Sequence, residues 1–213
     1  GGLLFAKLLV PETETPSYDE NSADGELDDK PANVIDAAAA GASAGLQLAL
    51  NVGAMLLAFI GLIAMINGIF SGVGGWFGMP ELSLELLLGW LFSPLAFLIG
   101  VPWSEAVVAG SFIGQKLVVN EFVAYLNFAP YLKDEVLING VAMSDHTKAI
   151  ISFALCGFAN LSSVAILLGG LGSMAPNRRG TIAKFGLKAV LAGSLSNLMS
   201  ATIAGFFLAL TAM

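Results

Sequence analysis

Charged residues are scarce in this sequence. They make up 12% of the 213 residues, whereas hydrophobic residues make up 56%, and a soluble domain typically carries about twice that charged fraction. Charges are absent altogether from three long stretches, 37–80, 149–177 and 189–213. Each stretch can supply the roughly 20 apolar residues with which a helix crosses a bilayer. The composition therefore argues against a soluble domain and predicts an all-α integral membrane protein.

Cysteine and histidine are nearly absent too. The one cysteine, Cys156, excludes an internal disulfide framework and a thiolate metal site, and we expect it to be a small buried side chain. The one histidine, His146, follows Ser144 and Asp145, and we expect it at the entry of a helix rather than in a metal or catalytic site. No P-loop or HExxH pattern supports an enzyme. We expect no catalytic residues and no bound metal or organic cofactor.

The negative charge is concentrated near the start of the chain. Residues 12–29 hold eight acids and no base, whereas eight acids face seven bases from residue 31 onward. The net charge of −7 therefore arises mainly from one segment, and the apolar body is close to neutral. We interpret 11–30 as a solvated cytoplasmic loop, in preference to a docking or regulatory segment. The charge pattern implies no nucleic-acid partner.

Apolar stretches and the turn residues between them predict a succession of helices. The chain opens inside an apolar run without an initiator Met, so we expect a fragment that begins within a helix. Glycines at 71–80 predict a turn at the headgroup level, where Trp76 is favoured. The predicted segments are the end of an upstream transmembrane helix (1–10), the acidic loop (11–30), an interfacial or packed helix (31–45), a transmembrane helix (46–70), an interfacial helix (82–101), a helical segment (102–130), an interrupted transmembrane helix (149–172) and the last transmembrane helix (189–213).

Lysine and arginine set the orientation of these segments. The basic residues between 178 and 188 should be cytoplasmic, whereas 71–80 and 129–148, which hold few bases or none, should lie outside. If 46–70 crosses the membrane once from the inside, both conditions are met only if residues 82–128 make no net crossing of the membrane. We therefore expect 102–130 to enter from outside and return as a re-entrant hairpin.

Two clusters of polar residues interrupt the apolar segments. Polar groups at membrane depth must be satisfied by protein, water or ligand, so they are candidates for function. The first cluster, Asn120-Glu121, lies at the expected hairpin tip, where a carboxylate can accept two hydrogen bonds from the neighbouring hydroxyls of a sugar. The alternative is a salt bridge to Lys116, whose spacing of five residues is not ideal for one.

The second cluster lies inside the span 149–172. Its members are polar or aromatic residues that weaken a helix locally or line a cavity: Phe158, Asn160, Ser162 and Ser163. A broken helix at the bilayer midplane is the usual substrate site of secondary transporters, whereas small polar residues also pack helices together. The residues alone leave these two alternatives open. For the serines and Asn197 in 194–200, we favour helix packing.

The chain resembles the concentrative nucleoside transporter family, in its C-terminal half. The resemblance rests on GSFIGQKLVVNEFVAY at 110–125, ALCGFANLSSVAILLGGLG at 154–172 and the ending NRRG…SLSNLMSATIAGFF. It implies a homotrimer in which each protomer moves a transport domain against a scaffold that includes 46–70. It also implies that 82–101 is an external helix.

The same resemblance implies a function for the two clusters. Glu121 resembles the carboxylate that binds the ribose hydroxyls of a nucleoside, Asn160 and Ser163 resemble its partners, and Phe158 resembles a residue on the ribose side. Asn120 adjoins this site without an assigned role.

The expected protein imports nucleosides by sodium or proton symport across a bacterial inner membrane. The N-terminal half would supply base recognition and most of the cation site. The rival interpretations are a lipid-acting membrane enzyme and a structural subunit that transports nothing.

Overall fold

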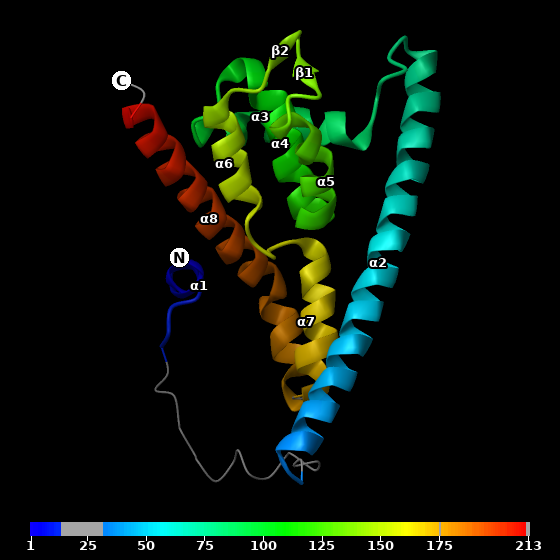
Figure 1. Ribbon diagram of the computed structural model, residues 1–213, viewed down its shortest axis with the longest axis vertical. Coiled ribbons are helices and arrows are strands. Elements are labelled where there is room, and N and C mark those ends of the chain that lie inside the picture. Colours follow the sequence, from blue (N-terminus) through cyan, green and yellow to red (C-terminus); the bar gives the residue numbers. More distant parts are fainter. Residues whose placement is uncertain (14–31, 175, 212–213) are drawn as a thin grey trace. The chain divides into compact units, whose positions relative to one another are not determined.

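Helices account for nearly all of the regular structure. The computed structural model describes residues 1–13, 32–174 and 176–211, so most of the predicted acidic loop 11–30 lies outside the described residues. In chain order the elements (Figure 1) are α1 (Gly2–Leu9), α2 (Val34–Trp76), α3 (Leu84–Leu98), α4 (Trp103–Val118), α5 (Glu121–Leu132), β1 (Leu137–Ile138), β2 (Val141–Ala142), α6 (Asp145–Leu155), α7 (Leu161–Met174), the 3-10 helix η1 (Pro176–Arg178) and α8 (Arg179–Thr211).

Two of the described helices, α2 and α8, are long and apolar enough to cross a membrane. Helices α3 and α4 meet the same criterion as a pair, although they are bent by 115° relative to each other. The chain divides into two compact units, one of residues 12–65 and one of residues 1–11 with 66–213. The described part of the smaller unit is helical, and its side chains are mostly exposed.

Helix α2 corrects two predicted boundaries. The segments 31–45 and 46–70 were expected to be separate helices, but one helix runs without a break from Val34 to Trp76. Nothing between them stops a helix, because the junction holds no proline and the alanines before it are strong helix formers. The glycines predicted to turn at 71–80 are helical as far as Trp76. Gly74 is needed there because a Cβ atom would collide with the carbonyl of Met79.

Asn67 ties the end of α2 to the start of α3. Its Nδ2 donates to Glu85 Oε2 at 2.9 Å, and its Oδ1 accepts from the backbone N–H of Leu84 at 2.8 Å. A further hydrogen bond joins the Ser71 hydroxyl to the Pro80 carbonyl at 2.9 Å. The corner between α2 and α3 is therefore held by side-chain hydrogen bonds.

Helices α3 and α4 pack backbone to backbone. The chain reverses between them through Gly100, whose φ of 108° is a left-handed conformation that favours glycine. A Cβ atom on Gly89 would lie 2.6 Å from the Val107 carbonyl oxygen, and one on Gly110 would lie 2.7 Å from the Ser93 nitrogen. Glycine at these positions allows the two helices to approach this closely.

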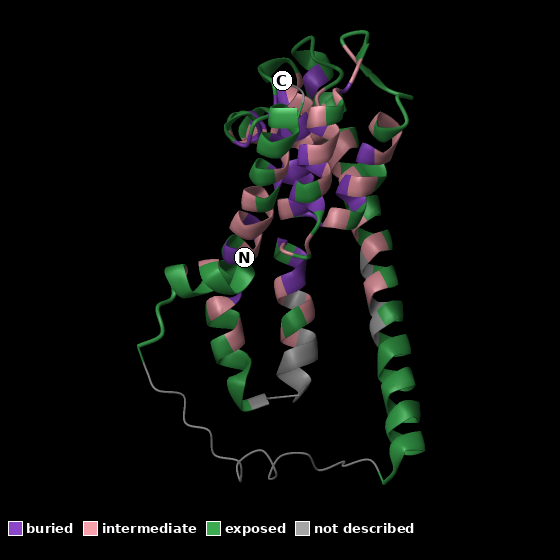
Figure 2. Cartoon of the chain, turned by 60° about the vertical axis from the view of Figure 1, so that its left-hand side comes forward, coloured by how far each residue is buried: buried purple, intermediate pink, exposed green. Residues whose placement is uncertain are grey.

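The core lies where α3 to α6 meet α8, and buried residues gather there in Figure 2. The Phe112 ring of α4 packs on the Phe128 ring of α5, with 5.2 Å between the centroids. Glu105 of α4 holds the start of α6, because its Oε1 accepts from the Ser144 N–H at 2.9 Å. His146 lies in the first turn of α6 and its Nε2 is 3.0 Å from the Gly205 carbonyl oxygen.

The last predicted spans differ from the structure at their ends. The interrupted helix 149–172 is α6 and α7, which begin and end a few residues further out. The final helix begins at Arg179, ten residues before the predicted start of 189–213, because the basic residues continue the helix. Cys156 lies in the break between α6 and α7 and is exposed, so the expectation of a buried thiol was wrong.

Candidate functional site

Two breaks in the helices meet at the candidate site. The first separates α4 from α5 at Val119 and Asn120, and the second separates α6 from α7 at residues 156–160. The Glu121 side chain from the first break accepts a hydrogen bond from Asn160 of the second, with 2.7 Å between Oε2 and Nδ2. Side chains 39 positions apart in the sequence are therefore in direct contact.

Asn120 is the N-cap of α5. Its Oδ1 accepts from the backbone N–H of Val123 at 2.9 Å, and the residue is 5% exposed. An asparagine cap satisfies one of the N–H groups that a helix start leaves without a partner. This cap fixes Glu121 as the first residue of α5. The structure thus gives Asn120 a local structural role that the sequence left unassigned.

Asn160 caps α7 and contacts Glu121 at the same time. Its Oδ1 accepts from the Ser163 N–H and the Ser162 hydroxyl, both at 2.7 Å. The Ser163 hydroxyl in turn donates to the Asn160 carbonyl at 2.6 Å. Asn160 is fully buried. Because the cap holds Oδ1, the amide cannot flip, and its Nδ2 must point toward Glu121.

The arrangement leaves part of the carboxylate available. Among the described residues, the side chain of Glu121 accepts this hydrogen bond through Oε2 alone. A carboxylate offers about four lone-pair sites on its two oxygens, so it can accept further hydrogen bonds from hydroxyl groups while Asn160 holds it in place. Sugars carry such hydroxyl groups, which are neutral hydrogen-bond donors.

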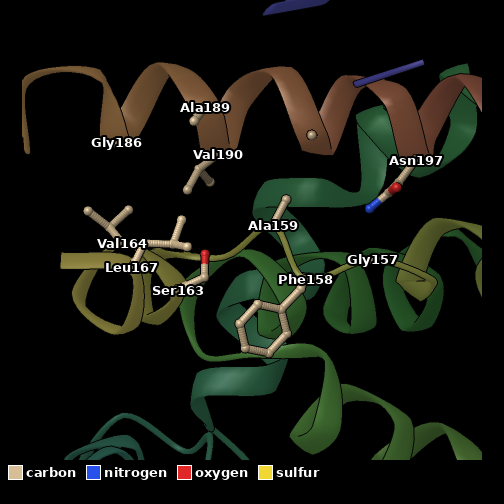
Figure 3. A pocket seen from close by; sticks show the side chains of 11 residues that line it. Gly157, Phe158, Ala159, Ser163, Val164, Leu167, Gly186, Ala189, Val190 and Asn197 are labelled. Carbon is tan, nitrogen blue, oxygen red and sulfur yellow. The ribbon is translucent and has the colours of Figure 1, made fainter. Parts of the chain in front are cut away.

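A pocket of about 260 Å³ opens beside the second break (Figure 3). Its walls come from the break, α7 and α8, and are mostly apolar. Ser163 and Phe158 both line it, and the Phe158 ring is 53% exposed. In Figure 3 the Phe158 ring points away from α8, whereas the Asn197 amide points from α8 toward the break at Gly157. Phe158 therefore lies next to the cluster, not within its hydrogen bonds.

The structure brings three of the five predicted residues into one hydrogen-bonded group: Glu121, Asn160 and Ser163. The sequence predicts a packing role for Asn197 but does not identify its partner, Gly157. The backbone of Gly157 lies directly against the Asn197 side chain, and the Asn197 Nδ2 is buried without a hydrogen-bond partner in the described part of the chain. The signal in the sequence was a polar residue, Asn197, within the charge-free stretch 189–213.

The described residues contain no group of three or more His, Cys, Asp or Glu side chains that could hold a metal ion.

One sequence, at residues 41–45, fits the GxSxG pattern of serine hydrolases. That motif works on a sharp strand-to-helix turn, whereas these residues lie inside α2. The pattern is therefore not a nucleophile site.

Comparisons with known proteins identify the relatives of the chain. Residues 1–205 match the family described as "Na+ dependent nucleoside transporter C-terminus". An uncharacterized transporter of Haemophilus influenzae is 59% identical over 99% of the chain and 50% of its own length. The nucleoside permease NupC of Helicobacter pylori is 57% identical over 100% of the chain and 49% of its own length. The chain thus spans about half the length of these curated relatives.

A solved structure shares the fold. The transporter CNTnw, in an inward-facing substrate-bound state, superposes with a TM-score of 0.84 at 64% identity, over 99% of this chain and 48% of that one. This match confirms the predicted all-α membrane fold and the predicted family resemblance. These relatives are transporters and permeases, not enzymes.

Proposed function

Because the chain belongs to the C-terminal part of the Na+-dependent nucleoside transporter family, we propose that it carries the ribose-binding half of a nucleoside site in a cation-coupled importer. The observation that supports this proposal is the hydrogen bond of 2.7 Å between Glu121 and Asn160. It joins the two helix breaks at a half-buried position and leaves carboxylate lone pairs for a ligand.

The chemistry of the cluster suits a ribose diol. Vicinal hydroxyls are two donors at fixed spacing, and Glu121 is a charged acceptor already oriented by Asn160. A ligand that lacks a hydroxyl would leave the half-buried Glu121 acceptor without a donor. We therefore expect 2′-deoxy and 3′-deoxy nucleosides to bind more weakly than ribonucleosides, because a site built for hydrogen bonds discriminates strongly against their loss.

The remaining proposals concern the complete protein. We propose that sodium or protons drive uptake, and that the N-terminal half supplies base recognition and most of the cation site. The full-length protein would be a homotrimer in a bacterial inner membrane. The hairpin of α4 and α5 would move with the transport domain against a scaffold that includes the predicted segment 46–70 of α2, as alternating access requires.

The test of this function uses the full-length transporter, purified and reconstituted into vesicles. Glu121→Gln keeps the shape of the side chain but removes the charge, so uridine uptake should fall at least about a hundredfold, since the charge-assisted hydrogen bonds to the ligand are lost. The matched control is Glu81→Gln, the same change at an exposed residue, and it should transport normally. Sedimentation should show the same trimer for both variants.

Two results would contradict the proposal. Normal uptake by Glu121→Gln would overturn the ribose assignment. Conversion of the substrate would be the second contradicting result, and chemical analysis of the accumulated nucleoside would detect it. A lipid-acting or nucleoside-converting enzyme would turn over a substrate, whereas a transporter returns uridine unchanged.

A further inference from the structure

The break between α6 and α7 deprives a backbone carbonyl of its helical partner. Helix α6 ends at Leu155, and in a continuing helix the Cys156 N–H would donate to the Ser152 carbonyl. It donates instead to the Phe153 carbonyl at 3.2 Å. The last carbonyls of a helix must find partners outside it, and a membrane interior offers few. The Ser152 carbonyl therefore needs a donor from another part of the chain.

Tyr125 of α5 supplies this donor. Its hydroxyl donates to the Ser152 carbonyl at 2.8 Å, across 27 positions of sequence. The hydroxyl of Ser152 itself is engaged within α6, because it donates to the Lys148 carbonyl at 2.8 Å. The Tyr125 ring packs against the buried core. Packing of the ring therefore aims the hydroxyl at the end of α6.

Tyr125 lies one helical turn after Glu121. Residues four apart lie on the same face of a helix, and this face of α5 meets the interrupted helix 145–174 on both sides of its break. Glu121 contacts Asn160, the cap of α7, after the break, and Tyr125 contacts Ser152 before it. In the described part of the chain, these are the two side-chain hydrogen bonds between α5 and the interrupted helix. Helix α5 therefore bridges the break.

The break itself is a short non-helical segment, residues 156–160. The Gly157 N–H reaches back to the Leu155 carbonyl at 2.7 Å, which closes a tight turn. Such a segment can bend, so the position of Asn160 relative to Glu121 depends on contacts with neighbouring helices. Asn197 packs on Gly157 from α8, and the Tyr125 hydroxyl holds the end of α6 from α5.

We propose that Tyr125 is a positioning residue of the ribose site, whose hydroxyl holds the end of α6 so that the Asn160 amide meets the Glu121 carboxylate. Tyr125 acts through these two residues and does not itself contact the nucleoside. Without its hydroxyl, only the far side of the break remains hydrogen-bonded to α5. Holding the break needs no ligand, whereas the effect on nucleoside binding rests on the proposed function.

The first test measures hydrogen exchange in the ligand-free, full-length transporter. Tyr125→Phe keeps the ring in the core and removes only the hydroxyl. Amides in the peptide 156–160 should exchange about tenfold faster or more, because the Ser152 carbonyl loses its donor and the break opens more easily. Unchanged exchange in this peptide would overturn the proposal.

Tyr131→Phe is the matched control for this test. It makes the same change near the other end of α5, where the Tyr131 ring packs on Phe112 with 5.3 Å between the centroids. Exchange of the peptide 156–160 should stay within about twofold of the parent protein. Equal acceleration in both variants would contradict the proposal, because it would show a general loosening of α5.

The second test compares the binding of uridine and 3′-deoxyuridine by calorimetry. Tyr125→Phe should weaken uridine binding about tenfold but 3′-deoxyuridine binding by no more than about threefold, because the deoxy ligand makes less use of the Glu121–Asn160 pair. The preference for uridine should therefore fall, whereas Tyr131→Phe should retain it. A loss of stability alone would weaken both ligands by the same factor, and that result would contradict the positioning role.

The two tests separate this inference from the proposed function. If exchange at the break rises in Tyr125→Phe but the parent protein binds the two nucleosides equally, Tyr125 holds the break and the ribose assignment fails. If the parent protein prefers uridine and Tyr125→Phe changes neither exchange nor preference, the ribose assignment stands and the role of Tyr125 fails. Faster exchange with an unchanged preference also overturns the positioning role.

Discussion

At the scale of single residues, two asparagines begin the helices that follow the two breaks. Asn120 uses its side-chain oxygen to cap α5. Asn160 does the same for α7 but also donates to Glu121. The sequence places both residues near breaks, because asparagine competes for backbone hydrogen bonds. It does not reveal that only one of them bridges the two breaks, since that depends on how distant segments pack.

Replacing Asn160 with aspartate separates its two roles. Asn160→Asp keeps an oxygen that can cap α7 but places a second carboxylate against Glu121 and removes the donor. Like charges at this distance repel strongly in a buried site, so uridine uptake by the full-length transporter should fall by about a hundredfold or more. The trimer should still assemble, because the cap remains.

Asn33 offers the matched control for this prediction. Its Oδ1 caps the start of α2 by accepting from the N–H groups of Ile35 and Asp36 at 3.0 and 2.9 Å, and the residue is exposed. Asn33→Asp should therefore leave uptake unchanged. Comparable losses in both variants would show that Asn160 acts only through its cap.

At the scale of helices, glycines misled the prediction in one place and set a helix contact that was not predicted in another. The run 71–80 predicts a turn, yet α2 continues through its glycines to Trp76. The glycines of α3 and α4 carry no such signal, yet they set the distance between the two helices. Sequence pattern locates helices well because apolar length and charge are local properties. Helix contacts depend on pairing between segments, which a single sequence does not specify.

Adding one methyl group tests the contact between α3 and α4. A Cβ atom on Gly110 would lie 2.7 Å from the Ser93 nitrogen, so Gly110→Ala should force the helices apart and destabilise the fold by about 1–3 kcal/mol. Gly72→Ala is the control, because nothing lies within 4 Å of a Cβ atom there and alanine is the better helix former. Thermal unfolding of the full-length transporter should separate the two, and equal Tm values would contradict the close packing.

At the scale of the whole chain, the helical membrane character follows from where charges are missing. The same charge-free stretches say little about how the helices are connected in space. The contacts of Glu121 with Asn160 and of Asn197 with Gly157 each join segments about 40 residues apart. Only the family resemblance predicted that Glu121 and Asn160 act together. For Asn197 the sequence predicted packing but did not identify Gly157 as the partner.

The corner between α2 and α3 can be tested by hydrogen exchange. Asn67→Leu removes the acceptor of the Leu84 N–H and the partner of Glu85, so the amide of Leu84 should exchange faster by about tenfold or more. Ser71→Ala, which removes one hydrogen bond to the Pro80 carbonyl, should leave the Leu84 amide protected. Unchanged exchange in Asn67→Leu would mean that packing alone holds the corner.

The two attachments of α3 differ in stiffness. Its glycine contact with α4 is backbone against backbone and cannot yield without separating the helices, whereas its attachment to α2 through Asn67 consists of side-chain hydrogen bonds, each worth only about 1 kcal/mol net. Helix α3 is therefore attached rigidly to α4 and only weakly to α2, through Asn67. A displacement that moves α4 together with Glu121 at the start of α5 would therefore move α3 as well. The hydrogen bonds of Asn67 would then be the contacts that are strained.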